Sequence, residues 1–216
     1  MKIVCIIPAH LASVRLKKKV LIKFYGLEML EHVRRRVLLS DIFDEVLVAT
    51  GDEEIASLIE SYGGNVVRTL SQHINGTSRV AEAIKNIDAT HIVLVQGDEP
   101  LLLPSHLYAL VDAMRKHPED DAWNATAPLT KISQLDKHSF VKCAITETQK
   151  ILYCFRRSPS FVSIDIQKSY IRKILGLIAF RKNSLLKISK MRPSIIEKKE
   201  FIEQIRIIVN GFLFYS

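Results

Sequence analysis

The segment that decides the fold class is H-I-V-L-V-Q-G-D-E-P, residues 91–100. After an initial histidine the residues up to 95 are all apolar, and Gly97 and Pro100 then break the run with a turn. A strand that is apolar at successive positions is typical of a parallel sheet whose two faces are both covered by helices. We therefore predict that residues 91–95 form a buried strand whose carboxyl end delivers Asp98 to the turn.

Strands and helices alternate on both sides of this segment through the first half of the chain. Short apolar runs predict strands over residues 3–7, 45–50 and 66–67. Periodic apolar spacing predicts helices over residues 27–39, 53–62, 78–86 and 107–117. Thr77 is the expected N-cap of the helix over residues 78–86. The alternation is typical of βαβ units. We therefore predict an α/β fold with a mainly parallel central sheet and helices on both faces.

The pattern changes after Trp123. Further strands, with only short helices between them, are predicted over residues 141–146, 151–155 and 175–180. They indicate a smaller antiparallel arm in the C-terminal third. A final amphipathic helix is expected over residues 197–209. Because no linker rich in Pro, Gly or Ser divides the chain, we predict a single domain over residues 1–216.

The composition is that of a globular protein. The chain has 216 residues, of which 48% are apolar and 25% charged, so it can bury a core without a disulfide or a metal. No apolar run approaches the roughly 18 residues of a membrane span, and we expect no membrane insertion. Cys5, Cys143 and Cys154 have neither paired nor metal-ligand spacing. We interpret them as buried free thiols of a cytoplasmic protein.

The chain is basic, with 31 Lys and Arg residues against 23 Asp and Glu residues and a net charge of +8. Such a charge suits nucleic acid, an anionic membrane or a polyphosphate ligand. The first basic cluster, residues 15–19, contains no aromatic residue for stacking on bases. We therefore expect no nucleic-acid partner. Only the net positive charge supports the alternative hypothesis, a nucleic-acid-binding domain. None of the seven histidines shows a spacing typical of a metal site.

Three loops follow predicted strands and are expected to meet at one crevice, since parallel strands share the edge at which they end. They cover residues 9–19, 51–53 and 96–100. The first contains Ser13, Arg15 and Lys19, groups that can wrap a triphosphate. It lacks the glycines of the common phosphate-binding fingerprints, so a solvated basic loop is the alternative interpretation.

Asp98 is expected at the floor of this crevice. Mg²⁺ takes few protein carboxylates and completes its shell with phosphate oxygens and waters, so a carboxylate beside a polyphosphate is a suitable ligand. The alternative is a carboxylate that closes the turn or caps the next helix.

Several segments together carry the pattern of one enzyme family. Residues 6–21 read I-I-P-A-H-L-A-S-V-R-L-K-K-K-V-L, and residues 95–100 read V-Q-G-D-E-P. The other segments of this pattern end at residue 206 and read, in chain order, V-A-T-G-D-E-E-I, H-I-N-G-T-S-R, F-V-K-C, L-Y-C-F-R, I-L-G-L-I-A-F-R and E-x-x-E-F-I-E-Q-I-R. These segments resemble, in the same order, those of the CMP-Kdo synthetases (3-deoxy-manno-octulosonate cytidylyltransferases; Kdo is 3-deoxy-manno-octulosonate). The opening segment and V-Q-G-D-E-P are the most specific of them.

The resemblance implies a Rossmann-like nucleotidyltransferase fold, a homodimer, and the activation of a sugar acid by CTP for lipopolysaccharide or surface polysaccharide synthesis. The anomeric hydroxyl of the sugar would attack the α-phosphate of CTP and release pyrophosphate. By position, the resemblance implies a triphosphate site at Ser13, Arg15 and Lys19, and a cytidine site at Arg79 and Gln96. It implies Mg²⁺ at Asp98, catalytic roles for Lys19, Asp98 and Arg15, and a sugar-acid site at Arg156, Glu203 and Gln204.

The chain also departs from the family pattern. His10 replaces an Arg of the opening segment, Ser78 replaces an acidic residue, and a P-x-K-P frame is changed by Lys17, Lys18 and Val20. Ile174 and Ile178 replace a His and a Tyr that face the sugar in the family. Two apolar side chains cannot hydrogen-bond hydroxyls, so we expect weak activity on Kdo itself and better activity on a less polar acceptor.

In the family, a V-D-T-P-E-D segment with a second Mg²⁺ ligand follows the position at which the printed sequence ends, Ser216. A truncated sequence, a substitute carboxylate and impaired metal binding are the three explanations. The favoured hypothesis is an active CMP-sugar synthetase for Kdo or a modified relative. The alternatives are a degenerate, weakly active or inactive homologue that acts as a binding or dimeric subunit, and a CMP-nonulosonate synthetase.

Overall fold

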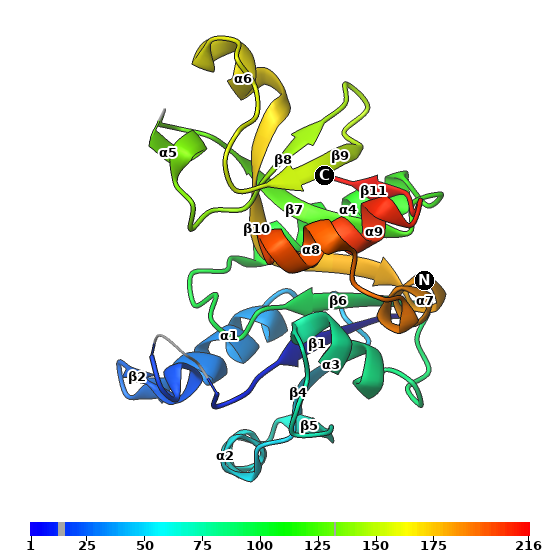
Figure 1. Ribbon diagram of the computed structural model, residues 1–216. Helices are drawn as coiled ribbons and strands as arrows, with labels where there is room; N and C mark the ends of the chain where they lie inside the picture. Colours follow the sequence, from blue (N-terminus) through cyan, green and yellow to red (C-terminus); the bar gives the residue numbers. More distant parts are fainter. Residues whose placement is uncertain (13–15, 132) are drawn as a thin grey trace.

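The predicted strands of the first half lie side by side and run parallel. They are β1 (Ile3–Pro8), β4 (Glu45–Thr50), β5 (Asn65–Arg68) and β6 (His91–Val95). Their order in the sheet is β6-β1-β4-β5 (Figure 1). The computed structural model describes residues 1–12, 16–131 and 133–216. In a parallel array all four strands end at one edge of the sheet, which brings the loops that follow them together.

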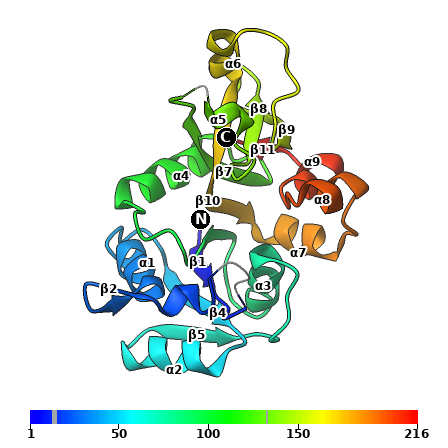
Figure 2. The same cartoon turned by 60° about the vertical axis from the view of Figure 1, so that its left-hand side comes forward.

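Helices cover both faces of this sheet, as predicted. On one face lie α1 (Met29–Leu38), α2 (Glu53–Ser61) and α4 (Pro104–Lys116), and on the other α3 (Gly76–Ala83) and α7 (Lys182–Lys190). Figure 2 shows α1 and α4 on one side and α3 and α7 on the opposite side. β1 serves both cores: Val4 and Ile6 pack toward α3, whereas Ile3, Cys5 and Ile7 pack toward α1. The continuous apolar sequence of the strand follows from this double burial.

The second half widens the sheet beyond β6 with β7 (Ala122–Pro128), β10 (Ile171–Arg181) and β11 (Phe214–Tyr215). β10 is antiparallel to both β6 and β7, so the complete sheet is mixed. A hairpin of β8 (Lys142–Ile145) and β9 (Ile151–Phe155) pairs with β10 and projects together with α5 (Ser133–Asp136) and α6 (Ile164–Tyr170), at the top of Figure 1. The predicted antiparallel arm is confirmed. β7 was not predicted, because its sequence A-W-N-A-T-A-P has no run of β-branched residues.

Two helices of the first half begin elsewhere than predicted. The N-cap of α3 is Asn75 and not Thr77: the Asn75 side chain accepts a hydrogen bond from the Ser78 amide at 2.9 Å, which places Thr77 inside the first turn. α1 begins at Met29 because the two residues before it form β3 (Leu27–Glu28), which pairs with β2 (Lys23–Phe24). A short 3₁₀ helix, η1 (Lys19–Leu21), precedes this hairpin.

The helix predicted over residues 197–209 is divided in two, which is the largest difference from the sequence prediction. α8 (Ile195–Glu200) ends at Phe201, whose φ of 54° is left-handed, and α9 (Ile205–Val209) begins after a short turn. Apolar periodicity runs through the break because Ile202 and Ile205 are both buried in the same core. The break leaves Glu203 and Gln204 in the turn between the two helices.

Cys5, Cys143 and Cys154 are all buried, as predicted. Burial raises the pKa of the Cys143 thiol to about 12. In the part of the chain that the structure describes, no helix has the length and apolar character needed to cross a bilayer.

Candidate active site

Two adjoining cavities open beside the carboxyl ends of the parallel strands. The loop cavity, of about 740 Å³, is lined by residues from all three predicted loops, including His10, Lys19, Asp52 and Asp98. The three loops therefore converge as predicted. The arm cavity, of about 570 Å³, is lined by residues of β10, α8, the turn after α8 and the segment before β8. The two cavities share the residues Ile74, Asn75, Gln96 and Glu203, which form the wall between them.

Asp98 and Lys19 meet at the floor of the loop cavity. Asp98 lies three residues beyond the end of β6, and its carboxylate forms an ion pair with the ammonium group of Lys19 at the start of η1. The Asp98 side chain is 34% exposed and the Lys19 side chain 29% exposed, so both can be reached from the cavity. Ser13 and Arg15, the other predicted triphosphate residues, lie outside the described residues.

Arg79 lines the loop cavity but uses its guanidinium on the chain itself. It donates to the Thr69 hydroxyl at 2.6 Å, to the Leu70 carbonyl at 3.0 Å and to the Ser71 carbonyl at 3.1 Å. Burial lowers the pKa of Arg79, although the charges of nearby carboxylates oppose this shift. The arginine therefore fixes the segment after β5, which forms part of the cavity wall.

Gln96 lies at the boundary of the two cavities with an exposed side chain. Its backbone N–H donates to the Gly176 carbonyl on β10 at 3.0 Å, so the neighbouring strand β10 fixes the backbone at this position. The exposed side-chain amide of Gln96 has no hydrogen-bond partner among the described residues and lines both cavities.

Glu203 also lies at this boundary, in the turn between α8 and α9, and its neighbour Gln204 lines the arm cavity. Glu203 Oε2 is buried and has no hydrogen-bond partner among the described residues. Burial raises the pKa of the Glu203 carboxyl. Hydrogen bonding to Thr77 and the positive charge of Arg206 lower this pKa, whereas the negative charge of Glu197 raises it. A buried acceptor without a donor is costly, and a hydroxyl group of a bound ligand would satisfy it.

Arg156 is not among the residues that line either cavity. Its guanidinium donates to the carbonyls of Glu200 at 2.8 Å, Phe201 at 3.0 Å and His138 at 3.0 Å. These contacts tie the end of β9 to the carboxyl end of α8. The structure thus brings Glu203 and Gln204 together but leaves Arg156 outside their cavity.

The two isoleucines that depart from the family pattern have different surroundings. Ile174 lines the arm cavity. Ile178 is 5% exposed, belongs to the core and borders only a void of about 20 Å³. An irregularity in the pairing of β10 with β7 lies between the two positions.

Sequence reasoning missed Glu99 and Lys173, which also line the arm cavity. Glu99 is half-buried, and burial together with the charge of Asp98 raises the pKa of its carboxyl. Gly176 leaves the space that Glu99 occupies, because a Cβ there would lie 2.6 Å from Glu99 Oε1. Both residues belong to quoted segments or adjoin them, but only the fold shows that β10 passes beside the turn after β6.

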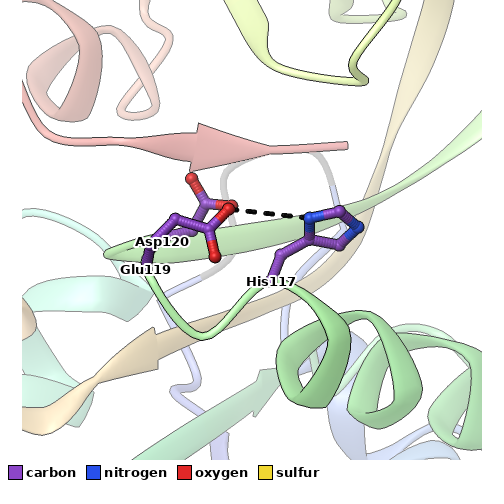
Figure 3. A group of neighbouring side chains, drawn as sticks. All are labelled: His117, Glu119 and Asp120. Atoms are coloured by element: carbon purple, nitrogen blue, oxygen red, sulfur yellow. Dashed lines mark ion pairs between the residues drawn. The ribbon is translucent and has the colours of Figure 1, made fainter.

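Figure 3 shows a group of possible metal ligands, His117, Glu119 and Asp120. None of the three lines either cavity. The Lys150 ammonium group lies 2.5 Å from Asp120 and 3.3 Å from Glu119, and it therefore neutralises these carboxylates. The His117 ring stacks on Tyr215 with ring centroids 4.1 Å apart. We interpret the group as an anchor for β11 and not as a metal centre.

Asp98 is the better candidate for a Mg²⁺ ligand. Its partly exposed carboxylate opens on a cavity with room for a polyphosphate, and Mg²⁺ favours such a site, with few protein ligands and with phosphate oxygens. The residues present therefore fit the ion.

Comparison with known proteins agrees with this geometry. Residues 4–214 match a family model described as cytidylyltransferase. The 3-deoxy-manno-octulosonate cytidylyltransferase of Chlorobium phaeobacteroides is 36% identical over 215 residues, which cover 98% of this chain and 87% of the relative. The enzyme of the same description from Escherichia coli is 32% identical over 212 residues, 97% of this chain and 85% of the relative.

Solved structures agree as well. CMP:2-keto-3-deoxy-manno-octonic acid synthetase complexed with CTP has a TM-score of 0.92 and 29% identity, over 100% of this chain and 88% of the other. A cytidylyltransferase from Leptospira borgpetersenii, at 17% identity and a TM-score of 0.64, shares the fold over 99% of this chain and 74% of its own. The predicted fold class is thereby confirmed. The chain belongs to the cytidylyltransferase family, and within it to the CMP-Kdo synthetases, the 3-deoxy-manno-octulosonate cytidylyltransferases.

Proposed function

We propose that this protein transfers the cytidylyl group of CTP to Kdo, which gives CMP-Kdo and pyrophosphate for lipopolysaccharide synthesis. The observation that carries the proposal is the pair of adjoining cavities that share Gln96 and Glu203, in a chain similar throughout to 3-deoxy-manno-octulosonate cytidylyltransferases. A donor in one cavity and an acceptor in the other would meet at the shared wall. Holding two reactants in this way removes much of the entropic cost of a bimolecular reaction.

CTP binds in the loop cavity under this proposal. Lys19, with Ser13 and Arg15, holds the triphosphate, and Arg79 and Gln96 lie near the cytidine. The side chain of Lys19 is partly exposed at the cavity floor, and this position supports its role in holding the triphosphate. Phosphoryl transfer depends on alignment and on compensation of negative charge more than on a covalent nucleophile, and basic groups at this floor supply that compensation.

Kdo binds in the arm cavity, against Glu203 and Gln204. The unpartnered Glu203 oxygen supports this assignment, since it is an acceptor suited to a sugar hydroxyl. The anomeric oxygen of Kdo forms a bond to the α-phosphorus of CTP, the bond from that phosphorus to the β-phosphate oxygen breaks, and pyrophosphate leaves. The proton of the anomeric hydroxyl passes to solvent or to a nearby base.

Mg²⁺ is the proposed cofactor, and Asp98 would hold it. The ion supplies Lewis-acid stabilisation of the charge on the phosphate oxygens. Lys19 neutralises the Asp98 carboxylate in the structure. Phosphate oxygens compete for the same ammonium group, so binding of CTP would draw Lys19 toward the nucleotide and make the carboxylate available.

A homodimer in the cytoplasm is the proposed assembly and location. Phe161, Val162 and Ile166, in and before α6, are 104%, 45% and 55% exposed, and a second copy could cover these apolar side chains. The buried free thiols suit a reducing compartment. Light scattering of the purified protein would test the dimer, and a monomer at micromolar concentration would contradict it.

Pyrophosphate release tests the activity. We expect release from CTP that requires both Mg²⁺ and Kdo, with little release from ATP, GTP or UTP. No release with Kdo or related sugar acids would favour instead a degenerate homologue that acts as a binding subunit.

A further inference from the structure

The arm cavity contains a positive charge that the roles above leave without a function. Lys173, on β10, lines this cavity, and its ammonium group lies 4.4 Å from the centre of the Phe140 ring. Among the described residues it has no carboxylate within ion-pair distance. Lys173 is only partly exposed, so its charge is directed into a region that water reaches incompletely.

Other cations surround this position. Lys137 lies over the same Phe140 ring at 4.9 Å. Lys142, directly across the strand pair from Lys173, is fully buried and donates to the carbonyls of Lys137 and Arg156. Burial lowers the pKa of Lys142, the charge of Asp136 raises it, and the charge of Arg156 lowers it further. Nearby Asp136 pairs with exposed Arg157, at 3.5 Å. Glu99 beside Lys173 and Asp136 near Lys142 offset part of this positive charge, but Lys173 has no ion-pair partner among the described residues, and an anion in the arm cavity would pair with it directly.

The guanidinium of Arg156 is not available to such an anion in this structure. All three of its nitrogens donate to backbone carbonyls, and the residue does not line the cavity. Moving it into the cavity would leave the last carbonyls of α8 without these donors.

Lys173 also lies near the expected reaction centre. In a 2-keto sugar acid the carboxylate is bonded to the carbon that bears the attacking hydroxyl, so its ligand must reach the wall between the cavities. Lys173 precedes Gly176 by three residues on β10, and the Gly176 carbonyl accepts from the Gln96 amide in that wall. The charge of Lys173 also acts on the Glu99 carboxyl beside it.

We propose that Lys173 binds the carboxylate of the sugar-acid acceptor, and that Arg156 is a positioning residue which holds α8 against the hairpin of β8 and β9. This inference rests on the proposed function, because it assumes that the arm cavity binds the acceptor. An ammonium–carboxylate contact at a partly buried site is a charge-assisted hydrogen bond, which gives both affinity and selection for acids over neutral sugars.

Steady-state kinetics of the full chain with CTP, Mg²⁺ and Kdo test the assignment. Lys173→Met keeps the apolar stem against Phe140 and removes the charge. We expect the KM for Kdo to rise about ten- to a hundredfold, as for the loss of one charge-assisted hydrogen bond, while the KM for CTP stays unchanged. Lys173→Arg should restore part of the loss. The matched control is Lys187→Met, at an exposed position of α7 outside both cavities, which should change neither constant.

A Kdo analogue with a carboxamide in place of the carboxylate identifies the group that is recognised. In the wild type this change should lower kcat/KM strongly, and in Lys173→Met the penalty should nearly vanish. Arg156→Lys should keep the full penalty and lose thermal stability. An unchanged KM for Kdo in Lys173→Met, or a penalty removed by Arg156→Lys alone, would overturn the assignment.

Binding measurements allow the same comparison of Kdo with its carboxamide when no reaction takes place. If the wild type does not turn over Kdo, the proposed function fails, and calorimetric Kd values for Kdo and its carboxamide then decide the role of Lys173. Weaker Kdo binding by Lys173→Met supports the assignment, and equal binding, or no binding by the wild type, overturns it.

Discussion

Lys19 and Asp98 lie 79 positions apart in the sequence and meet at the floor of the loop cavity. About a third of each side chain is exposed, so water screens the pair and its contribution to stability is at most about 1 kcal/mol. The value of the contact is therefore in placing a cation and a carboxylate where a triphosphate and its metal ion would bind.

Asp98→Asn separates the contribution of this carboxylate to stability from its proposed contribution to metal binding. The substitution preserves shape and removes the charge that Mg²⁺ needs, so we expect kcat to fall by about a hundredfold or more, with little change in melting temperature. Asp88→Asn is the control, because Asp88 pairs with Lys2 outside both cavities. Transfer by Asp98→Asn within a few-fold of the wild type would contradict the metal-ligand role.

Glu203 gives a pH-dependent prediction. Burial raises the pKa of its carboxyl above the ordinary value of 4.5, so the folded state retains this proton to a higher pH than the unfolded chain does. The contribution of Glu203 to the free energy of unfolding should therefore fall as pH rises from about 4.5 through the raised pKa. Glu203→Gln has no such group to titrate.

Scanning calorimetry between pH 5 and pH 8 measures this effect. The melting temperature of Glu203→Gln relative to the wild type should increase with pH, because only the wild type has the Glu203 carboxyl, which loses its proton over the interval. A difference that does not vary with pH would show that Glu203 titrates normally in spite of its burial.

At the scale of elements, β10 determines much of the arm cavity. One strand provides Lys173 and Ile174 to the cavity wall, the space for Glu99 at Gly176, and Ile178 to the core. This distribution modifies the expectation that both isoleucines face the sugar. Ile174 is the position at which a polar substitution would reach the acceptor directly.

The double substitution Ile174→His with Ile178→Tyr should therefore separate into two effects. Ile174→His should raise kcat/KM for Kdo, since it supplies a hydrogen-bonding group to the cavity. Ile178→Tyr should cost about 1–3 kcal/mol in urea unfolding, because the adjacent void of about 20 Å³ cannot hold the added atoms without displacement. High wild-type activity on Kdo that Ile174→His fails to improve would show that this position does not select the acceptor.

The sequence predicted those elements whose signal is local. The apolar runs of β1, β4 and β6 and the loops that follow them were placed within a residue or two, because continuous burial leaves a direct trace in composition. The division between α8 and α9 was not visible, since Ile202 and Ile205 preserve a helical period across it. Lys173 and Glu99 were missed because their cavity depends on the antiparallel return of β10 beside β6. Arg156 could be named from its motif, but its three carbonyl partners depend on the tertiary fold.

At the scale of the whole molecule, the two halves of the sheet have different tasks. The parallel half supplies the loop cavity, and β10 with α8 and the turn before α9 supplies the arm cavity. Because the walls of the loop cavity come from several separate segments, this site exists only in the folded chain. A nucleotide that binds there should therefore stabilise the native state.

Thermal protection by nucleotides measures that coupling. CTP with Mg²⁺ at a hundredfold excess over its Kd should add about 2.7 kcal/mol and raise the melting temperature by about 5–10 °C. ATP and GTP should protect much less, because the proposed cytidylyl donor is CTP and not a purine nucleotide. Equal protection by all three nucleotides would show that only the triphosphate is recognised.

The most direct test of the central claim follows the oxygen atom that joins the two substrates. Kdo labelled with ¹⁸O at its anomeric hydroxyl is incubated with CTP, Mg²⁺ and the wild-type protein, and the products are examined by ³¹P NMR and mass spectrometry. We predict CMP-Kdo that retains ¹⁸O in the bond between sugar and phosphorus, together with unlabelled pyrophosphate in equal amount. The absence of CMP-Kdo, or a product whose phosphorus bears no label from Kdo, would contradict the transfer of CMP from CTP to the sugar acid.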